Sequence, residues 1–165
     1  MPPVLILSTG GTFNKVYDPI RGELVIDPQA RALHTIAAKW QADLAIDTLI
    51  HKDSLQMGDG DRAELIDAVR TASADRIVIV HGTDTMDQSA RALADAKLGK
   101  RIILTGAMVP FHIDPVEATA NLSAAITHAQ ADDAPGVYLA LHGFFGPHET
   151  IVKDRRAGRF VRITP

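Results

Sequence analysis

The sequence predicts an α/β protein in which a doubly wound, mostly parallel sheet carries helices on both faces. Two observations lead to this fold class. Five short apolar runs rich in Val, Ile and Leu recur along the 165 residues, and segments of helical period separate them. Continuous apolar runs are typical of strands buried on both faces of a parallel sheet. Their alternation with helices indicates βαβ units, and therefore a doubly wound sheet.

The predicted strands and helices follow one another in turn. Strands are expected at residues 4–7, 44–50, 76–80, 101–104 and 137–141. Helices are expected at residues 28–39, 61–73, 86–98 and 115–130. Asp27 is the expected N-cap of the first helix, because Pro28 suits the first helical position. Residues 150–153 and 160–163 are expected to pair as a terminal hairpin.

The composition indicates one domain over residues 1–165 and excludes several functions. Hydrophobic residues make up 46% of the chain, which is enough for a core, and the formal net charge of −3 argues against a nucleic-acid partner. Cysteine does not occur, which excludes disulfides, thiolate catalysis and Cys-ligated zinc. No apolar run approaches the length of a membrane span. We therefore expect a cytoplasmic protein with no nucleic-acid and no membrane partner.

The sequence contains no pattern for a metal or a cofactor. None of the seven histidines stands in an H-x-x-x-H or H-E-x-x-H spacing. Residues 58–61 resemble the start of a calcium loop, but the later Glu is missing, and we interpret them as a turn and N-cap. The G-x-G-x-x-G spacing of a dinucleotide site is missing too. We expect neither metal nor cofactor.

Polar and glycine-rich residues concentrate directly after the predicted strands, where doubly wound sheets bind their ligands. The first such segment, Ser8-Thr9-Gly10-Gly11-Thr12, follows the first strand. Its adjacent glycines allow a sharp turn and a close backbone approach to a ligand. A plain strand-to-loop turn is the alternative, but a threonine on each side of the glycines favours chemistry.

The second segment follows the third predicted strand and reads H-G-T-D-T-M over residues 81–86. Asp84 and Thr85 are good helix N-caps, which would be a purely structural role. Two hydroxyls around one carboxylate also suit recognition of an ammonium group and activation of a nucleophile or water. Lys153, which follows a break in the apolar pattern, becomes of interest if it is buried beside a hydroxyl, where it can act as a base.

Together these segments resemble the bacterial-type L-asparaginases. That family carries T-G-G-T near the amino terminus and H-G-T-D-T-M in mid-chain, and both stand here unbroken, at residues 9–12 and 81–86. Further matches are Asp53-Ser54 with Met57, T-G-A-M at residues 105–108 with Pro110, and Val152-Lys153. The resemblance covers essentially the whole chain and implies the fold of the family's amino-terminal domain.

The resemblance implies hydrolysis of L-asparagine to L-aspartate and ammonia through a threonine acyl-enzyme. Thr12 matches the family's primary nucleophile, and Tyr17 is the tyrosine in reach to assist it. Thr83 would position or activate the hydrolytic water, with Lys153 tuning it and Asp84 bridging. Which threonine attacks first is left open.

The same resemblance implies where the small amino-acid amide binds. Ser54 and Asp84 would hold its α-carboxylate and α-ammonium, beside Thr83. Backbone N–H groups around Gly11 and Gly82 would form the oxyanion hole.

Two departures from the family concern the lid and the length. Residues 16–27, which Pro19 and Gly22 punctuate, are a lid candidate, although Tyr17 lies closer to Thr12 than in the longer enzymes. The carboxy-terminal domain of the longer members has no counterpart in these 165 residues. We therefore expect a short-chain form with a more open site. The alternative is that these residues are a piece of a longer member of the family.

Two other functions stay open at this point. One is a glutaminase-like amidotransferase subunit. Such a subunit would need a surface that faces tRNA, and the mildly acidic net charge of the chain counts against this. The other is a non-catalytic binding module of the same fold, against which the intact motifs count. In each case we expect a homodimer or higher homo-oligomer, because the family assembles and a missing domain would leave apolar surface to cover.

Overall fold

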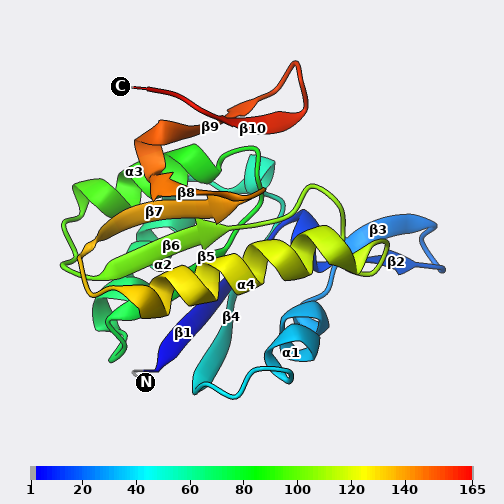
Figure 1. Cartoon of the computed structure of the whole chain (residues 1–165). Helices are drawn as coiled ribbons and strands as arrows, with labels where there is room; N and C mark the ends of the chain where they lie inside the picture. The colour runs from blue at the N-terminus through cyan, green and yellow to red at the C-terminus, as the bar shows by residue number, and fades with distance from the viewer. Residues whose placement is uncertain (1–2, 165) are drawn as a thin grey trace.

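The computed structural model describes residues 3–164, which build a six-stranded sheet (Figure 1). The strand order is β4-β1-β5-β6-β7-β8, and within this sheet β8 runs antiparallel to its neighbour while the others are parallel. The strands are β1 Val4–Gly10, β4 Leu44–Lys52, β5 Arg76–Val80, β6 Arg101–Thr105, β7 Gly136–Leu141 and β8 Phe144–Pro147. This mostly parallel sheet confirms the predicted fold class.

Helices cover both faces of the sheet. They are α1 Arg31–Ala37 and α4 Pro115–Ala131 on one face, and α2 Asp59–Thr71 and α3 Met86–Asp95 on the other. Successive residues of a strand point into two separate cores, so that Val78 packs on the α1–α4 side while Ile77 and Ile79 pack on the α2–α3 side. All three are fully buried, which explains why β5 is an unbroken apolar run.

The strand order places a crevice at the carboxyl ends of β1 and β5. From β1 the chain crosses over α1 to β4 on one side, whereas from β5 it crosses over α3 to β6 on the other side and the other face. The two connections therefore diverge between β1 and β5, which is the topological switch point where such sheets bind ligands. The pairing of Ser8 with Val80 brings the ends of these two strands level.

One connection has the unusual hand. Both the β5-α3-β6 and β6-α4-β7 connections step in the same direction along the sheet, yet α3 and α4 lie on opposite faces (Figure 1). The two crossovers must therefore have opposite hands. The connections through α1, α2 and α3 all have the same hand. Because about 98% of crossovers between parallel strands are right-handed, these three are right-handed and β6-α4-β7 is left-handed. This crossover puts α4 beside α1.

Two small antiparallel pairs complete the fold. They are β2 Lys15–Asp18 with β3 Glu23–Ile26, and β9 Ile151–Asp154 with β10 Arg159–Arg162. The second pair is the predicted terminal hairpin. Among residues 3–164, three short 3-10 helices lie at the loops: η1 Thr12–Asn14, η2 Ser54–Gln56 and η3 His148–Thr150.

Two predicted helix starts were wrong. α1 begins at Arg31, because Ala30 adopts a left-handed conformation (φ 47°) and the Asp27 carboxylate accepts from the Arg31 N–H at 3.1 Å, one turn later than predicted. α2 begins at Asp59 rather than at Asp61, with Gly58 as its N-cap, and the Asp61 carboxylate, inside the first turn, accepts from the Gly58 N–H at 2.9 Å.

The strand β8 is absent from the sequence-based prediction. His142 and Gly143 both have positive φ, at 52° and 79°, and form a two-residue turn that folds Phe144 back onto Leu141. Pro147 ends the strand, at an edge where its missing N–H is tolerated. The segment after β7 is therefore a tight hairpin rather than a loop.

Replacing Asn121 is expected to destabilise the fold. Its side chain, 3% exposed on α4, donates to the Gly106 carbonyl at 2.8 Å and accepts from the His142 N–H at 2.8 Å. Asn121→Ala leaves both backbone groups buried without a hydrogen-bond partner. It should lower the free energy of unfolding, measured by urea titration, by about 3 kcal/mol. Thr127→Ala, at an exposed position of the same helix, is the control and should be near neutral. Equal losses in the two variants would contradict this role.

Candidate active site

The two glycine motifs meet in the crevice. A Cβ on Gly11 would lie 2.6 Å from the Gly82 nitrogen, closer than atoms can approach, and Gly11 also has a positive φ of 74°. The backbones after β1 and β5 are therefore in direct contact, and a larger residue at Gly11 would force them apart. This contact brings the loop of Thr12 against the loop of Thr83.

Buried packing and hydrogen bonds hold the loop that carries Thr12. Phe13 is fully buried in the α1–α4 core, and the Asn14 amide donates to the Gly10 carbonyl at 3.1 Å and to the Ser8 hydroxyl at 3.2 Å. Thr12 itself opens η1 and is partly buried. Within residues 3–164 its hydroxyl makes no hydrogen bond, which leaves it available to a ligand.

Lys153 joins the hydroxyl and the carboxylate of the second motif. Its Nζ donates to Thr83 Oγ1 at 2.8 Å and to Asp84 Oδ1 at 2.8 Å, from strand β9 at the far end of the chain. The Lys153 side chain is 14% exposed and that of Asp84 38%. Arg155 donates to the Asp84 carbonyl and so ties the β9–β10 turn to the same loop. The arrangement can polarise the Thr83 hydroxyl and move a proton to or from it.

A small cavity opens beside this cluster. It has a volume of about 90 Å³ and is lined by Thr83, Asp84, Asp87, Lys153 and Arg155 together with apolar side chains of β7, β9 and β10. A larger hollow of about 320 Å³ lies at the opposite end of the sheet, where Lys97 and Lys100 meet apolar residues and no carboxylate. Of these two, the smaller cavity combines a hydroxyl, an amine and a carboxylate.

Ser54 lies against the second motif, but inside the protein. A Cβ on Gly82 would stand 2.7 Å from Ser54 Oγ, and this hydroxyl accepts from the Thr85 N–H at 3.3 Å. The Thr85 hydroxyl in turn donates to the Ser54 carbonyl at 2.8 Å. Because Ser54 is 0% exposed, its hydroxyl contacts the loop rather than solvent in this conformation. Its binding to a substrate carboxylate stays a prediction.

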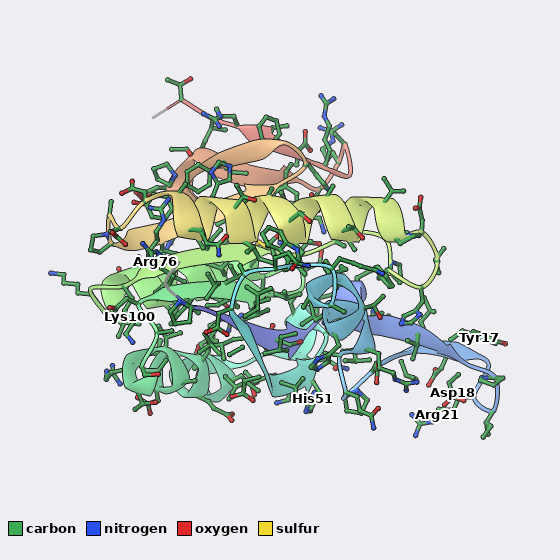
Figure 2. The ribbon with its side chains drawn as sticks, turned by 60° about the horizontal axis from the view of Figure 1, so that its bottom comes forward. Tyr17, Asp18, Arg21, His51, Arg76 and Lys100 are labelled. Carbon is green, nitrogen blue, oxygen red and sulfur yellow. The ribbon has the colours of Figure 1, made fainter. Side chains whose placement is uncertain are left out.

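Tyr17 is not brought to the threonines. It stands on β2 with 64% of its surface exposed, and Figure 2 shows it at the outer end of the β2–β3 hairpin with Asp18 and Arg21. No hydrogen bond within residues 3–164 links Tyr17 to Thr12 or Thr83. The predicted lid is thus a hairpin in an extended position.

An ion pair anchors the base of this hairpin. Lys15 Nζ lies 2.8 Å from the Asp53 carboxylate, and this hydrogen bond holds the pKa of Asp53 below its ordinary value, with the more distant Lys153 acting in the same direction. The pair connects β2 to the segment that carries Ser54.

Several residues beneath the loops were missed by sequence reasoning. Arg62 on α2 is buried and bonds Thr85 and Ser89, and Ser89 in turn bonds His81. Glu117 on α4 accepts from the Met108 N–H at 2.7 Å and contacts His142 Nε2 at 2.7 Å. Charged residues at inward-facing helix positions are the signal that could have identified Arg62.

Two further observations concern metal binding and membrane spans. Across residues 3–164 no group of three or more His, Asp or Glu side chains is arranged to hold a metal ion. In the same residues no helix is both long and apolar enough to cross a bilayer.

The fold and the site thus define an α/β protein with a threonine–lysine–aspartate cluster at its switch point. A family model described as asparaginase, N-terminal, matches residues 3–156, and the chain belongs to this family. This confirms the resemblance that the two threonine motifs carry.

Individual relatives agree with this assignment. A probable periplasmic L-asparaginase of Haemophilus influenzae is 30% identical over 86% of this chain and 43% of its own length. One subunit of the glutamyl-tRNA(Gln) amidotransferase of Methanopyrus kandleri is 27% identical over 87% of this chain and 33% of its own. The thermostable L-asparaginase of Thermococcus kodakarensis superposes with a TM-score of 0.82 at 26% identity, covering 98% of this chain and 51% of that structure. The chain spans about half or less of the length of these relatives.

His81 is expected to make the fold less stable as the pH falls. Burial, with the nearby Arg62 charge acting in the same direction, lowers the pKa of its imidazole from 6.5 to about 4. Between these values the unfolded chain binds a proton that the folded protein does not. The free energy of unfolding is therefore complete above pH 6.5 and falls as the pH is lowered toward 4, by at most about 1.4 kcal/mol per pH unit.

Urea unfolding at several pH values across this window measures the slope. His81→Gln should flatten it, whereas His51→Gln, at an exposed position, should leave it unchanged. A His81→Gln variant with the wild-type slope would show that His81 is not responsible.

Proposed function

We propose that the chain is an amidohydrolase that converts L-asparagine to L-aspartate and ammonia through a threonine acyl-enzyme. The observation that carries the proposal is Lys153 Nζ at 2.8 Å from both Thr83 Oγ1 and Asp84 Oδ1, on a loop whose Gly82 backbone contacts the loop of Thr12 at Gly11. A hydroxyl held by an amine and a carboxylate is the arrangement that activates a nucleophile or a water molecule. Membership of the asparaginase family supports the same reaction.

In the proposed reaction Thr12 Oγ attacks the side-chain amide carbon and loses its proton to the departing nitrogen, which leaves as ammonia. The carbonyl oxygen carries negative charge as the tetrahedral intermediate forms, and backbone N–H groups around Gly11 and Gly82 stabilise it. Water then attacks the resulting ester. Thr83 takes the proton of this water as it passes its own proton to Lys153, which acts as a neutral amine. The proton then returns to Thr12 Oγ as the ester bond breaks and aspartate leaves.

Substrate binding in this proposal uses both sides of the crevice. Asp84 has its second carboxylate oxygen available for the α-ammonium group, since Lys153 bonds Oδ1. Ser54 would receive the α-carboxylate, which requires its segment to shift because the side chain is buried. Tyr17 would approach Thr12 when the β2–β3 hairpin closes, and the Lys15–Asp53 ion pair would couple the two movements.

We also propose a cytoplasmic homodimer or higher homo-oligomer. Light scattering that gives a monomer would contradict the oligomeric state. Export of the native gene product through a leader would contradict the cytoplasmic location. A solved structure named as a probable cytoplasmic L-asparaginase of Campylobacter jejuni favours the location, whereas one relative is named as periplasmic.

A second candidate is a glutaminase activity within an amidotransferase, which the relatives named as glutamyl-tRNA(Gln) amidotransferase subunits favour. A binding module without catalysis is the third. Coupled detection of ammonia from L-asparagine and from L-glutamine separates the three. Faster release from asparagine supports the proposal, faster release from glutamine favours the second candidate, and no release from either at millimolar concentration leaves the binding module.

Each threonine is expected to be indispensable. Thr12→Ala and Thr83→Ala should each lower kcat by about 1000-fold or more, because each removes a group that bonds or relays protons to the reacting atoms. Thr71→Ala, which removes an exposed hydroxyl of α2, is the control and should keep wild-type kcat. Near-normal kcat in either active-site variant would exclude the role assigned to that threonine.

Lys153→Met should abolish turnover and leave the protein folded. The methionine fills similar volume but cannot exchange a proton with Thr83 or bond Asp84. Steady-state kinetics together with a thermal melt checks both parts. If the melting temperature collapsed together with the activity, Lys153 would be a structural residue instead.

A further inference from the structure

Below the second motif lies a buried cation whose partners are neutral. Arg62, 8% exposed on α2, donates from Nε to Ser89 Oγ at 3.2 Å, from Nη1 to the Met57 carbonyl at 3.2 Å and from Nη2 to Thr85 Oγ1 at 3.1 Å. Among the ion pairs of residues 3–164 none includes Arg62. Asp61 acts on this guanidinium through its charge but forms no ion pair with it. A buried cation that is hydrogen-bonded to neutral groups alone costs free energy, so stability by itself is a poor explanation for this residue.

The hydrogen bonds that start at Arg62 can run in one direction only. A guanidinium donates and never accepts, so Ser89 Oγ is an acceptor for Arg62 Nε and has its single proton left for His81 Nε2, at 2.7 Å. His81 Nδ1 lies 2.7 Å from the Gly82 carbonyl, which can only accept. Nδ1 therefore carries a proton. Because burial lowers the pKa of the ring to about 4, His81 is neutral at pH 7 and its Nε2 accepts from the Ser89 hydroxyl.

The end of this chain of hydrogen bonds is the peptide bond that leads to Thr83. Its carbonyl, from Gly82, receives the His81 proton, and its N–H belongs to Thr83. Across residues 3–164 the Thr83 N–H has no hydrogen-bond partner, although Thr83 is 8% exposed. Hydrogen bonds in series polarise one another, so a carbonyl that accepts a strong bond makes the N–H on the same peptide a better donor.

Arg62 also controls the other end of the loop. Its Nη2 bonds the Thr85 hydroxyl, which donates onward to the Ser54 carbonyl at 2.8 Å. The guanidinium thus holds residues 82–85 at both ends, through His81 at Gly82 and directly at Thr85. Its planar fork fixes these directions together, which a lysine could not do.

We propose that Arg62 is a positioning residue that, through Ser89 and His81, orients and polarises the Gly82–Thr83 peptide so that the Thr83 N–H donates to the oxyanion. The inference rests on the proposed amidohydrolase function for its catalytic meaning, but the relay itself is a property of the folded protein. The three residues form a unit, named here the Arg62–Ser89–His81 relay.

Ser89→Ala is the sharpest variant, because it interrupts the relay and leaves the other two bonds of Arg62 in place. Ser89 is 0% exposed, and the change removes one oxygen atom. We expect kcat for the amide substrate to fall about fivefold to tenfold, with KM within about twofold, since the N–H acts on the developing oxyanion rather than on the bound substrate.

Val69→Ala is the matched control. Val69 is fully buried on the same helix as Arg62 and packs in the α2–α3 core, outside the relay. It should lower the melting temperature at least as much as Ser89→Ala while keeping kcat. If both variants lost stability and kept kcat, the relay would be a structural network and the proposal would be overturned.

Nuclear magnetic resonance tests the relay without any substrate. In the wild-type protein at neutral pH the ring nitrogen shifts of His81 should report the Nδ1–H form, and the Thr83 amide proton should move upfield in Ser89→Ala. The Nε2–H form in wild type, or an unchanged Thr83 resonance in the variant, would overturn the proposal. Because these readings need no turnover, they decide the relay even if asparagine is not hydrolysed, whereas ammonia release by the wild type decides the function separately.

Discussion

The backbone contact between Gly11 and Gly82 is the constraint on which the rest of the site depends. It holds the loops after β1 and β5 so close that a single Cβ at Gly11 would fall 2.6 Å from the Gly82 nitrogen. The contact exists because β1 and β5 are neighbours in the sheet although they are separated by β4 in the chain, and because the helices that follow them leave on opposite faces. The loops that carry Thr12 and Thr83 therefore lie against each other, although they are far apart in sequence.

Elements on both faces of the sheet hold the loops at this end of it. β9 delivers Lys153 from the α3 side, where Arg155 secures its turn to the Asp84 carbonyl. The left-handed crossover places α4 on the opposite face, so that Glu117 and Asn121 reach under the loops that follow β6 and β7 and bond their backbone groups. Without that crossover the loop after β6 would lack its carboxylate support, because a right-handed connection would put the helix beside α3.

The polar interior beneath the second motif differs in kind from the apolar cores on either side. Arg62, Ser89 and His81 lie at the junction of α2, α3 and β5, where Arg62 bonds Ser89, Ser89 bonds His81 and His81 bonds the Gly82 carbonyl. Such a network is sensitive to the removal of any member, because a buried polar group that loses its partner keeps its desolvation cost. This makes it suited to hold a short loop in one conformation. The β2–β3 hairpin is different. Its Tyr17 is exposed, and one ion pair holds its base, so few contacts restrain it.

The sequence by itself determined the fold class, because runs such as residues 76–80 are apolar at nearly every position and only a sheet covered on both faces buries them. It also determined the two threonine motifs and their family, and it identified Lys153 as a candidate partner. Tertiary structure alone decided that Lys153 reaches Thr83 and Asp84 together, that Ser54 faces inward and that Tyr17 stands away. It also revealed Arg62, β8 and the hand of the α4 crossover. These features depend on side-chain directions and strand neighbours that join residues up to 70 positions apart, as Lys153 and Thr83 are, and local propensity holds no information at that distance.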